Sequence, residues 1–196
     1  MPSRHRLIIG ISGASGVIYG VRLLEELKRH PELETHLVMS KPAERTLAEE
    51  TDYRPEQVKA LASVVHSPSD IGASIASGSF KTLGMVVIPC SIRSLSAIAS
   101  AHGDTLLTRA ADVVLKERRK LVLVVRETPF HRGHLKSMLD VTDAGAVVMP
   151  PVPAFYGRPK TIEDLIQQNL ARVLDHFDIE HSLGVRWGET KTAPEE

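Results

Sequence analysis

The sequence has a single cysteine, Cys90, among its 196 residues, so it cannot form a disulfide within the chain. One thiol is typical of a reducing compartment, and we expect a cytoplasmic protein in which Cys90 is a small packed residue. The chain has no run approaching the ~20 apolar residues that span a bilayer. Its start, MPSRHRLIIG, lacks the apolar region of a signal peptide. We therefore expect a soluble protein without membrane insertion.

The sequence also lacks an excess of charge, because 24 lysine and arginine residues balance 24 aspartate and glutamate residues. Proteins that bind nucleic acid or anionic membranes generally carry a basic excess, so neither partner is expected. The length and the 42% content of hydrophobic residues are sufficient for one core. We expect a single domain over residues 1–196, in which residues 179–196 form a polar C-terminal tail.

What the sequence does contain is an alternation of short apolar runs and amphipathic segments. The predicted strands are residues 7–11, 36–39, 63–66, 85–89, 121–125 and 146–149. The predicted helices are residues 17–27, 43–50, 91–101, 106–119, 134–143 and 162–177. Several apolar runs are continuous, as expected for strands that are buried on both faces of a parallel sheet. The alternation predicts an α/β fold with a doubly wound, mainly parallel sheet, a Rossmann-like and flavodoxin-like three-layer sandwich.

Two segments break this alternation. Residues 67–80, SPSDIGASIASGSF, are small and polar and indicate a long surface loop. Residues 149–160, MPPVPAFYGRPK, contain four prolines, which indicates a shaped loop rather than a random linker.

Hydroxyl groups and cations follow several of the predicted strands. The residues that follow the strands are Ser12 to Gly16 after the first, Ser40 and Lys41 after the second, Ser91 to Ser94 after the fourth, and Arg126 and Glu127 after the fifth. In a doubly wound sheet, ligands bind beyond the carboxyl ends of the strands. Free N–H groups and helix dipoles at that edge favour negative charge, so the sequence predicts a site for an anionic ligand.

The glycine-rich turn after the first strand narrows the choice of anion. It lacks the G-x-x-x-x-G-K-[ST] pattern of nucleoside triphosphate sites, and its G-x-x-G-x-x-G spacing differs from the G-x-G-x-x-G of dinucleotide sites. Ser40 and Lys41 end the second strand, where NAD sites usually place a carboxylate. A monophosphate cofactor remains, and FMN is the natural candidate.

Metal ligands are also scarce. The motif HRGH offers His131 and His134 without an obvious third ligand, and Asp140 and Asp143 lie on an ordinary polar helix face. We therefore expect no metal site.

Five motifs resemble those of the UbiX-like flavin prenyltransferases, in the same order along the chain as far as Arg172. They are GISGASGVIYG, HLVMSK, PCSIRSLSAIA, RAADVVLKERRKLVLVVRETP and MPPVPAFYGRP. The resemblance implies a flavoprotein domain that binds reduced FMN and attaches a dimethylallyl group from dimethylallyl phosphate at N5 and C6. It further implies a homo-oligomer, a dodecamer, and transfer of the prenylated FMN to a UbiD-like decarboxylase in ubiquinone biosynthesis or aromatic acid metabolism.

The same resemblance assigns roles to individual residues. The implied flavin contacts are Gly13, Ala14, Ser15, Ser40, Ser91, Ser94 and Arg126. The implied contacts to the prenyl donor are Arg109, Lys116, Tyr156, Arg172 and Trp187. The implied catalytic residues are Ser15, Glu50 and Glu127. One position departs from the family pattern, because Pro42 follows Ser-Lys where alanine is more usual.

Several alternatives stay open at this point. The protein is alternatively an FMN-dependent aromatic-acid decarboxylase, or a non-catalytic FMN carrier. Glu127 is a proton acceptor or the partner of Arg126 in a buried ion pair, and Glu50 competes for the proton-transfer role. Arg109 and Lys116 are seven residues apart, a spacing that is also typical of a solvated helix stripe. Trp187 contacts the prenyl group or simply anchors the tail.

Overall fold

The computed structural model describes residues 5–188 and contains two compact units, Met1–Pro151 and Val152–Glu196. The expectation of a single domain stays a prediction. Within residues 5–188, no helix is long and apolar enough to cross a membrane.

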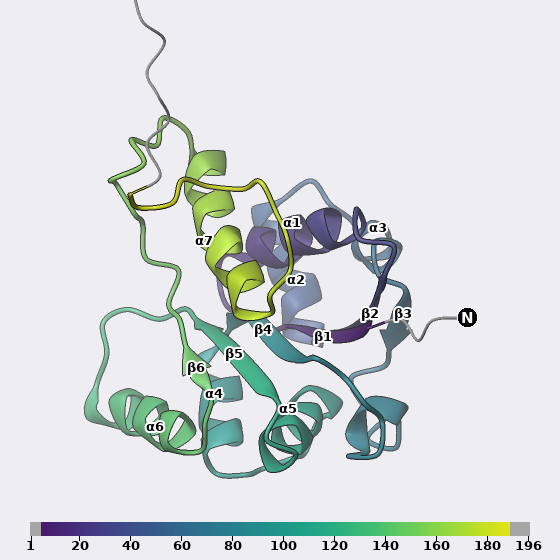
Figure 1. The fold of residues 1–196 in the computed structure, drawn as a ribbon. Coiled ribbons are helices and arrows are strands. Elements are labelled where there is room, and N and C mark those ends of the chain that lie inside the picture. Colours follow the sequence, from purple (N-terminus) through teal and green to yellow (C-terminus); the bar gives the residue numbers. More distant parts are fainter. Residues whose placement is uncertain (1–4, 189–196) are drawn as a thin grey trace, which may run out of the picture. The chain divides into compact units, whose positions relative to one another are not determined.

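The first unit is built on one six-stranded sheet (Figure 1). Its strands are β1 (His5–Ile11), β2 (Leu33–Met39), β3 (Val64–His66), β4 (Gly84–Cys90), β5 (Lys120–Val125) and β6 (Val147–Val148). All neighbours pair in parallel, in the order β3-β2-β1-β4-β5-β6. The predicted fold class is confirmed. The strand order is the Rossmann order rather than the five-strand flavodoxin order.

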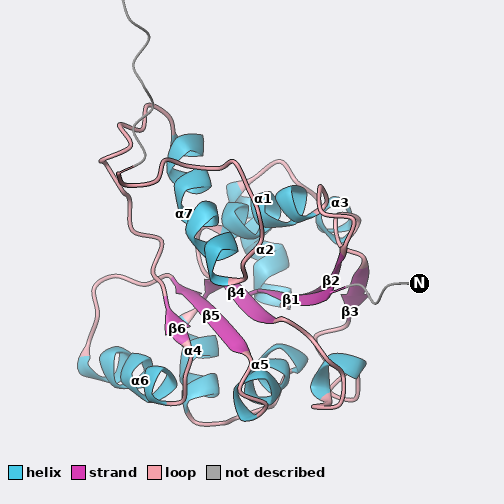
Figure 2. Cartoon of the chain, viewed as in Figure 1, coloured by secondary structure: helices cyan, strands magenta, loops and turns pink. Residues whose placement is uncertain are grey.

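Helices flank this sheet on both faces (Figure 2). The helical segments of the first unit are α1 (Val17–Leu27), α2 (Lys41–Glu50), α3 (Pro55–Lys59), η1 (Ser74–Ala76), α4 (Ile92–Ala99), α5 (Leu106–Lys116) and α6 (Arg132–Asp143). Helices α1 and α2 contact each other on one face, and α4 lies with α5 and α6 on the other. The second unit contains α7 (Ile162–His176).

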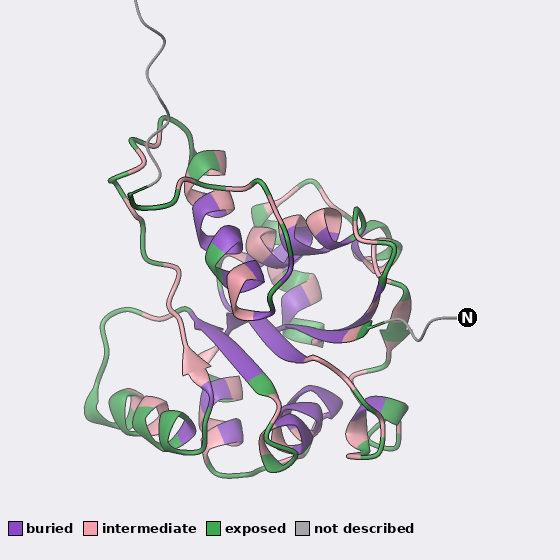
Figure 3. Ribbon diagram, in the orientation of Figure 1, coloured by how far each residue is buried: buried purple, intermediate pink, exposed green. Residues whose placement is uncertain are grey.

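The central strands are buried along their length, as their continuous apolar sequence predicts (Figure 3). All seven residues of β4 are buried, and so are the last five of β5. These strands pack against the apolar faces of α4 and α5 in one core cluster. A sheet that is covered on both faces presents polar groups only at its edges and ends.

Two short elements were not predicted, α3 and η1. The second lies in residues 67–80, where the surface-loop interpretation is wrong at Ile75, whose exposed fraction is 1%. Ile75 belongs to the core cluster that α5 completes. One apolar residue among serines, alanines and glycines produces no periodicity, so the sequence could not show that this segment is anchored.

Cys90 ends β4 and is fully buried. Burial raises the pKa of its thiol to about 12. Because the thiolate is the reactive form, we expect no labelling of the native protein by a thiol reagent at pH 8, and complete labelling after unfolding in guanidinium chloride. Stoichiometric labelling of the native protein, followed by absorbance of the released thiol chromophore, would contradict this placement.

Candidate functional site

The carboxyl ends of β1 and β4 meet where the strand order reverses, and Ser12 joins them. The Ser12 hydroxyl donates to the Pro89 carbonyl at 2.8 Å, and the Ser12 backbone N–H donates to the same oxygen at 3.2 Å. The Ser12 hydroxyl in turn accepts a hydrogen bond from the Ser91 N–H at 2.7 Å. These bonds fix the start of α4 against the end of β1, at the position where doubly wound folds bind ligands.

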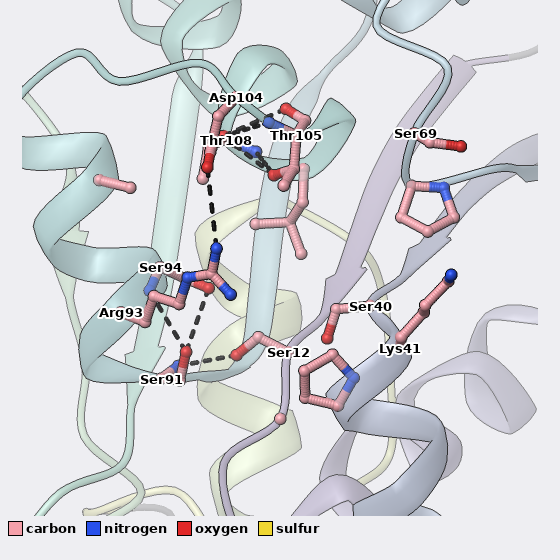
Figure 4. A pocket seen from close by; sticks show the side chains of 15 residues that line it. Ser12, Ser40, Lys41, Ser69, Ser91, Arg93, Ser94, Asp104, Thr105 and Thr108 are labelled. Carbon is pink, nitrogen blue, oxygen red and sulfur yellow. Dashed lines mark hydrogen bonds and ion pairs between the residues drawn. The ribbon is translucent and has the colours of Figure 1, made fainter.

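A cavity of about 430 Å³ opens at this point (Figure 4). Three helix N-termini border it, each with a hydroxyl as its N-cap. Ser40 accepts from the Ala43 N–H of α2 at 3.2 Å, Ser91 from the Ser94 N–H of α4 at 3.3 Å, and Thr105 from the Thr108 N–H of α5 at 3.3 Å. Three positive helix ends around one cavity favour an anionic ligand.

The walls of the cavity combine charge with apolar surface. Lys41 and Arg93 contribute positive charge, and Arg93 lies 3.8 Å from the carboxylate of Asp104. Leu107 and Ala97 contribute apolar surface. The volume falls within the ~300–1,000 Å³ that is usual for cofactor sites. The mixture of hydroxyls, cations and apolar walls fits a ligand with a phosphate and an aromatic ring system.

Four of the predicted flavin contacts line this cavity, namely Gly13, Ser40, Ser91 and Ser94. The sequence interpretation missed further residues that line the cavity, namely Pro68, Ser69, Asp104, Thr105 and Thr108. The T-x-x-T spacing of Thr105 and Thr108, at the start of the predicted helix 106–119, is a capping pattern. This pattern was the signal from which the two threonines could have been found. The Leu106 N–H donates to the Pro68 carbonyl at 2.9 Å and thereby ties the segment after β3 to α5.

Gly13 approaches α2 so closely that no side chain fits there. A Cβ atom at Gly13 would lie 2.4 Å from Cβ of Pro42 and 2.9 Å from its carbonyl carbon. Pro42, which the sequence analysis singled out as a departure from the family pattern, therefore packs directly on the glycine turn. Both residues line the cavity.

The start of α1 brings Ser15 close to Glu50 in space. Gly16 is the N-cap of α1 with φ +92°, a left-handed conformation that favours glycine, and it offers no side-chain cap. The Glu50 carboxylate caps the helix instead, because its Oε2 accepts hydrogen bonds from the Gly16 N–H at 2.8 Å and from the Val17 N–H at 3.4 Å. Ala14, Ser15 and Glu50 lie outside the lining of the 430 Å³ cavity.

Arg126 and Glu127 follow β5, as predicted. The Arg126 N–H donates to the Cys90 carbonyl at 3.0 Å, but its side chain is exposed. Glu127 is half-buried and accepts from the Thr128 N–H at 3.0 Å. The interpretation of these two residues as a buried ion pair is therefore wrong, because the chain leaves the sheet here and Arg126 faces solvent.

Arg109 and Lys116 both lie on α5, on the surface. Arg109 pairs with Asp112 at 3.0 Å, and Lys116 pairs with Glu117 at 2.6 Å. Neither lines the 430 Å³ cavity. In the isolated chain they form the solvated stripe that their spacing allows.

The second unit has its own pocket, of about 440 Å³, in which Tyr156, Arg172 and Trp187 meet. The rings of Tyr156 and Trp187 are edge to face, with centroids 5.3 Å apart. The predicted polar tail thus contributes structure as far as residue 188, whereas residues 189–196 lie outside the described part.

Asp175 organises the cations of this second pocket. Its carboxylate contacts Arg186 at 2.6 Å, Arg172 at 3.1 Å and His181 at 3.1 Å. Burial opposes ionisation of Asp175, but hydrogen bonds from Arg186 and His181 outweigh burial and lower its pKa. The sequence interpretation missed Asp175, Arg186 and His181, because they come together only when the segment after α7 folds back along it.

Residues 5–188 contain no group of three or more histidine, cysteine, aspartate or glutamate residues that could hold a metal ion. The rings of His131 and His134 lie close together, with centroids 3.6 Å apart. The absence of a metal requirement stays a prediction.

Known proteins resemble this chain over nearly its whole length. The model of the Flavoprotein family matches residues 1–174. The flavin prenyltransferase UbiX of Escherichia coli (strain K12) is 60% identical over 184 residues, which cover 93% of this chain and 97% of that protein. The chain belongs to the UbiX flavin prenyltransferase family. The predictions of the family and of a transferase with a flavoprotein fold are thereby confirmed.

Solved structures of UbiX-like proteins agree with this membership. A dodecameric FMN-dependent UbiX-like decarboxylase from Escherichia coli O157:H7 is 50% identical, with a TM-score of 0.91 over 93% of this chain and 98% of that chain. AnUbiX, in complex with FMN and dimethylallyl pyrophosphate, is 51% identical, with a TM-score of 0.87 over 93% of this chain and 100% of that chain. The UbiX-like fold therefore extends over nearly the whole chain.

Proposed function

We propose that this protein transfers the dimethylallyl group of dimethylallyl phosphate to reduced FMN in the cytoplasm and passes the prenylated FMN to a UbiD-like decarboxylase. The observation that carries the proposal is the convergence of three helix N-termini on one cavity in a chain of this family. The relative AnUbiX was solved with FMN and a prenyl donor bound, which supports the same pair of ligands here.

The first unit supplies the flavin site of this proposal. The hydroxyls of Ser40, Ser91 and Ser94 and the backbone at Gly13 would hold FMN, together with Ala14, Ser15 and Arg126. Hydroxyl and helix N–H groups suit a phosphate, and Leu107 and Ala97 suit an aromatic ring system. When bound, reduced FMN supplies nucleophilic positions at N5 and C6.

The second unit supplies groups that stabilise charge on the prenyl donor. When the allylic C–O bond breaks, negative charge develops on the phosphate, and Arg172 and the Tyr156 hydroxyl would stabilise it. Positive charge develops on the allyl group, and the face of Trp187 suits a cation better than water does. Arg109 and Lys116, which lie on α5 of the first unit, are assigned to the prenyl phosphate by resemblance to the family alone.

The proposed reaction also releases a proton when the new ring closes, so a base is required. We assign this role to Glu127. Glu50 has a structural task, because its carboxylate caps α1 beside Ser15. Ser15 and Glu50 complete the polar groups that we assign to the reaction.

One experiment tests the proposal. Purified protein is mixed with reduced FMN and dimethylallyl phosphate under anaerobic conditions in the presence of a chelator. The mass of the released flavin is then measured by mass spectrometry. We expect the mass of the flavin to increase by one five-carbon group. A parallel reaction with dimethylallyl pyrophosphate compares the two donors. Unmodified flavin would contradict the proposal. Release of carbon dioxide from an aromatic acid would then support the decarboxylase alternative, and tight retention of unchanged FMN alone would support the carrier.

We also expect a homo-oligomer, as a dodecamer. The solved relative from Escherichia coli O157:H7 is dodecameric, and the chain exposes Leu135 and Leu139 on one side of α6 with exposed fractions of 53% and 59%. Apolar surface of this kind is typical of an interface. Light scattering should give about twelve times the chain mass of 21.5 kDa, and Leu139→Glu should give smaller species. A single 21.5 kDa species at micromolar concentration would contradict the expectation.

A further inference from the structure

Gln168 lies on α7 with an exposed fraction of 9%, and both ends of its amide form hydrogen bonds. Its Oε1 accepts from the Val185 N–H at 2.9 Å. Its Nε2 donates to the Tyr156 hydroxyl at 2.8 Å and to the Val185 carbonyl at 3.2 Å. One buried amide therefore connects the proline-rich loop, α7 and the segment that carries Trp187.

The backbone of Val185 determines which way this amide points. A backbone N–H can only donate and a backbone carbonyl can only accept, so the oxygen of Gln168 must face the former and its nitrogen the latter. The nitrogen then also faces the Tyr156 hydroxyl, which must accept the hydrogen bond. Because that oxygen already accepts a hydrogen from Gln168, the hydrogen of the phenol is directed away from the amide and is available to another acceptor.

We propose that Gln168 is a positioning residue that makes Tyr156 a hydrogen-bond donor to the phosphate of the prenyl donor. This inference rests on the proposed function, in which Tyr156 and Arg172 bind that phosphate in the pocket of the second unit. Gln168 also holds the segment of Trp187 closely, since a Cβ atom on Gly184 would lie 2.7 Å from Gln168 Oε1. Gln168 lines the same pocket as Tyr156, and its role in this proposal is to orient the phenol.

The variant Gln168→Glu separates this role from simple packing. Glutamate has the shape of glutamine and can still accept from the Val185 N–H, but as a carboxylate it has no hydrogen to donate. The phenol would then donate to the introduced carboxylate, so it could no longer donate to the phosphate. We expect the KM for dimethylallyl phosphate to rise by about 10- to 100-fold, because a hydrogen bond to a charged group is lost. The affinity for inorganic phosphate, measured by calorimetry, should fall by a similar factor while FMN retention stays unchanged.

The matched control is Gln167→Glu, which introduces the same charge one residue earlier on α7. Gln167 is half-buried, its Nε2 lies 3.4 Å from Glu163 Oε1, and it does not line the pocket that contains Tyr156. We expect wild-type phosphate affinity in this control. Equal losses in both variants would mean that negative charge on the helix, rather than the orientation of the phenol, weakens binding, and would overturn the proposal.

A double-mutant cycle with Tyr156→Phe completes the test. If Gln168 acts through the phenol, Gln168→Glu should change phosphate affinity by less than about twofold in the Tyr156→Phe background. A full loss in that background would overturn the proposal. If thermal unfolding shows that Gln168→Glu does not fold, the neutral variant Gln168→Met takes its place in the same cycle, with the same two outcomes. The phosphate titration does not require prenyl transfer, so failure of the proposed function is recognised separately by the mass of the flavin from the wild-type protein.

Discussion

Replacement of Ser91 by aspartate is expected to abolish FMN binding while the protein stays folded. Ser91 is the N-cap of α4 and lines the cavity of the first unit. Aspartate is as good an N-cap as serine, so the helix should keep its stability. Two like charges about 4 Å apart repel by ~4 kcal/mol at an effective dielectric constant of 20, which corresponds to a loss of about 1,000-fold in affinity. Flavin absorbance of the purified variant measures the result.

The control for this prediction is Ser91→Asn. Asparagine has the size of aspartate and caps helices equally well, but it carries no charge. We expect this variant to retain much of its FMN and, once both variants have been freed of FMN, to melt at the same temperature as Ser91→Asp. Retention of FMN by Ser91→Asp at the wild-type level would show that the phosphate lies elsewhere.

Replacement of Glu127 by glutamine is expected to slow formation of prenylated FMN by ~10²–10⁴-fold, the usual cost of losing a positioned acid or base. Glutamine keeps an oxygen that can accept from the Thr128 N–H, the bond that Glu127 makes at 3.0 Å. The loop after β5 should therefore keep its conformation, and FMN should still bind. Single-turnover mass analysis of the flavin measures the rate, and absorbance of the same preparation measures FMN.

Glu50→Gln is the matched comparison for Glu127. Its amide oxygen can still accept from the Gly16 N–H, but the favourable interaction of a negative charge with the start of α1 is lost. We expect this variant to lose ~0.3–1 kcal/mol of stability in denaturant unfolding. Wild-type turnover by Glu127→Gln with intact FMN would remove Glu127 from the mechanism and assign proton transfer to Glu50. Loss of FMN from Glu127→Gln would instead indicate that the charge of Glu127 supports the flavin site.

Much of the cavity of the first unit could be predicted because parallel strands end at one edge of a sheet. Ser40 and Ser91 follow two buried apolar runs, and the sequence alone is enough to place them at that edge. Ser69 and Thr105 also line the cavity, but they could not be predicted in this way. Neither residue follows a strand directly, and they meet because the Leu106 N–H binds the Pro68 carbonyl.

The pocket of the second unit likewise contains residues that could be assigned from the sequence and a residue that could not. Tyr156, Arg172 and Trp187 were assigned through resemblance to a family, and the structure places them around one pocket. No pattern in the sequence indicates that Gln168 lies between Tyr156 and Val185. Its hydrogen bonds depend on how the chain after α7 turns back, which local propensity does not encode.

The sequence by itself determined the alternation of buried strands and amphipathic helices, the parallel sheet and the edge at which an anion is expected to bind. Hydrophobic periodicity carries this information because it indicates which faces of a helix or strand are buried when the chain folds. Only the tertiary structure decided the Rossmann order of the strands, the burial of Ile75, the exposure of Arg126 and the contacts of Gln168. Periodicity reports that a residue is buried but not which neighbour buries it, and hydrogen bonds between distant segments form only once the fold has brought those segments together.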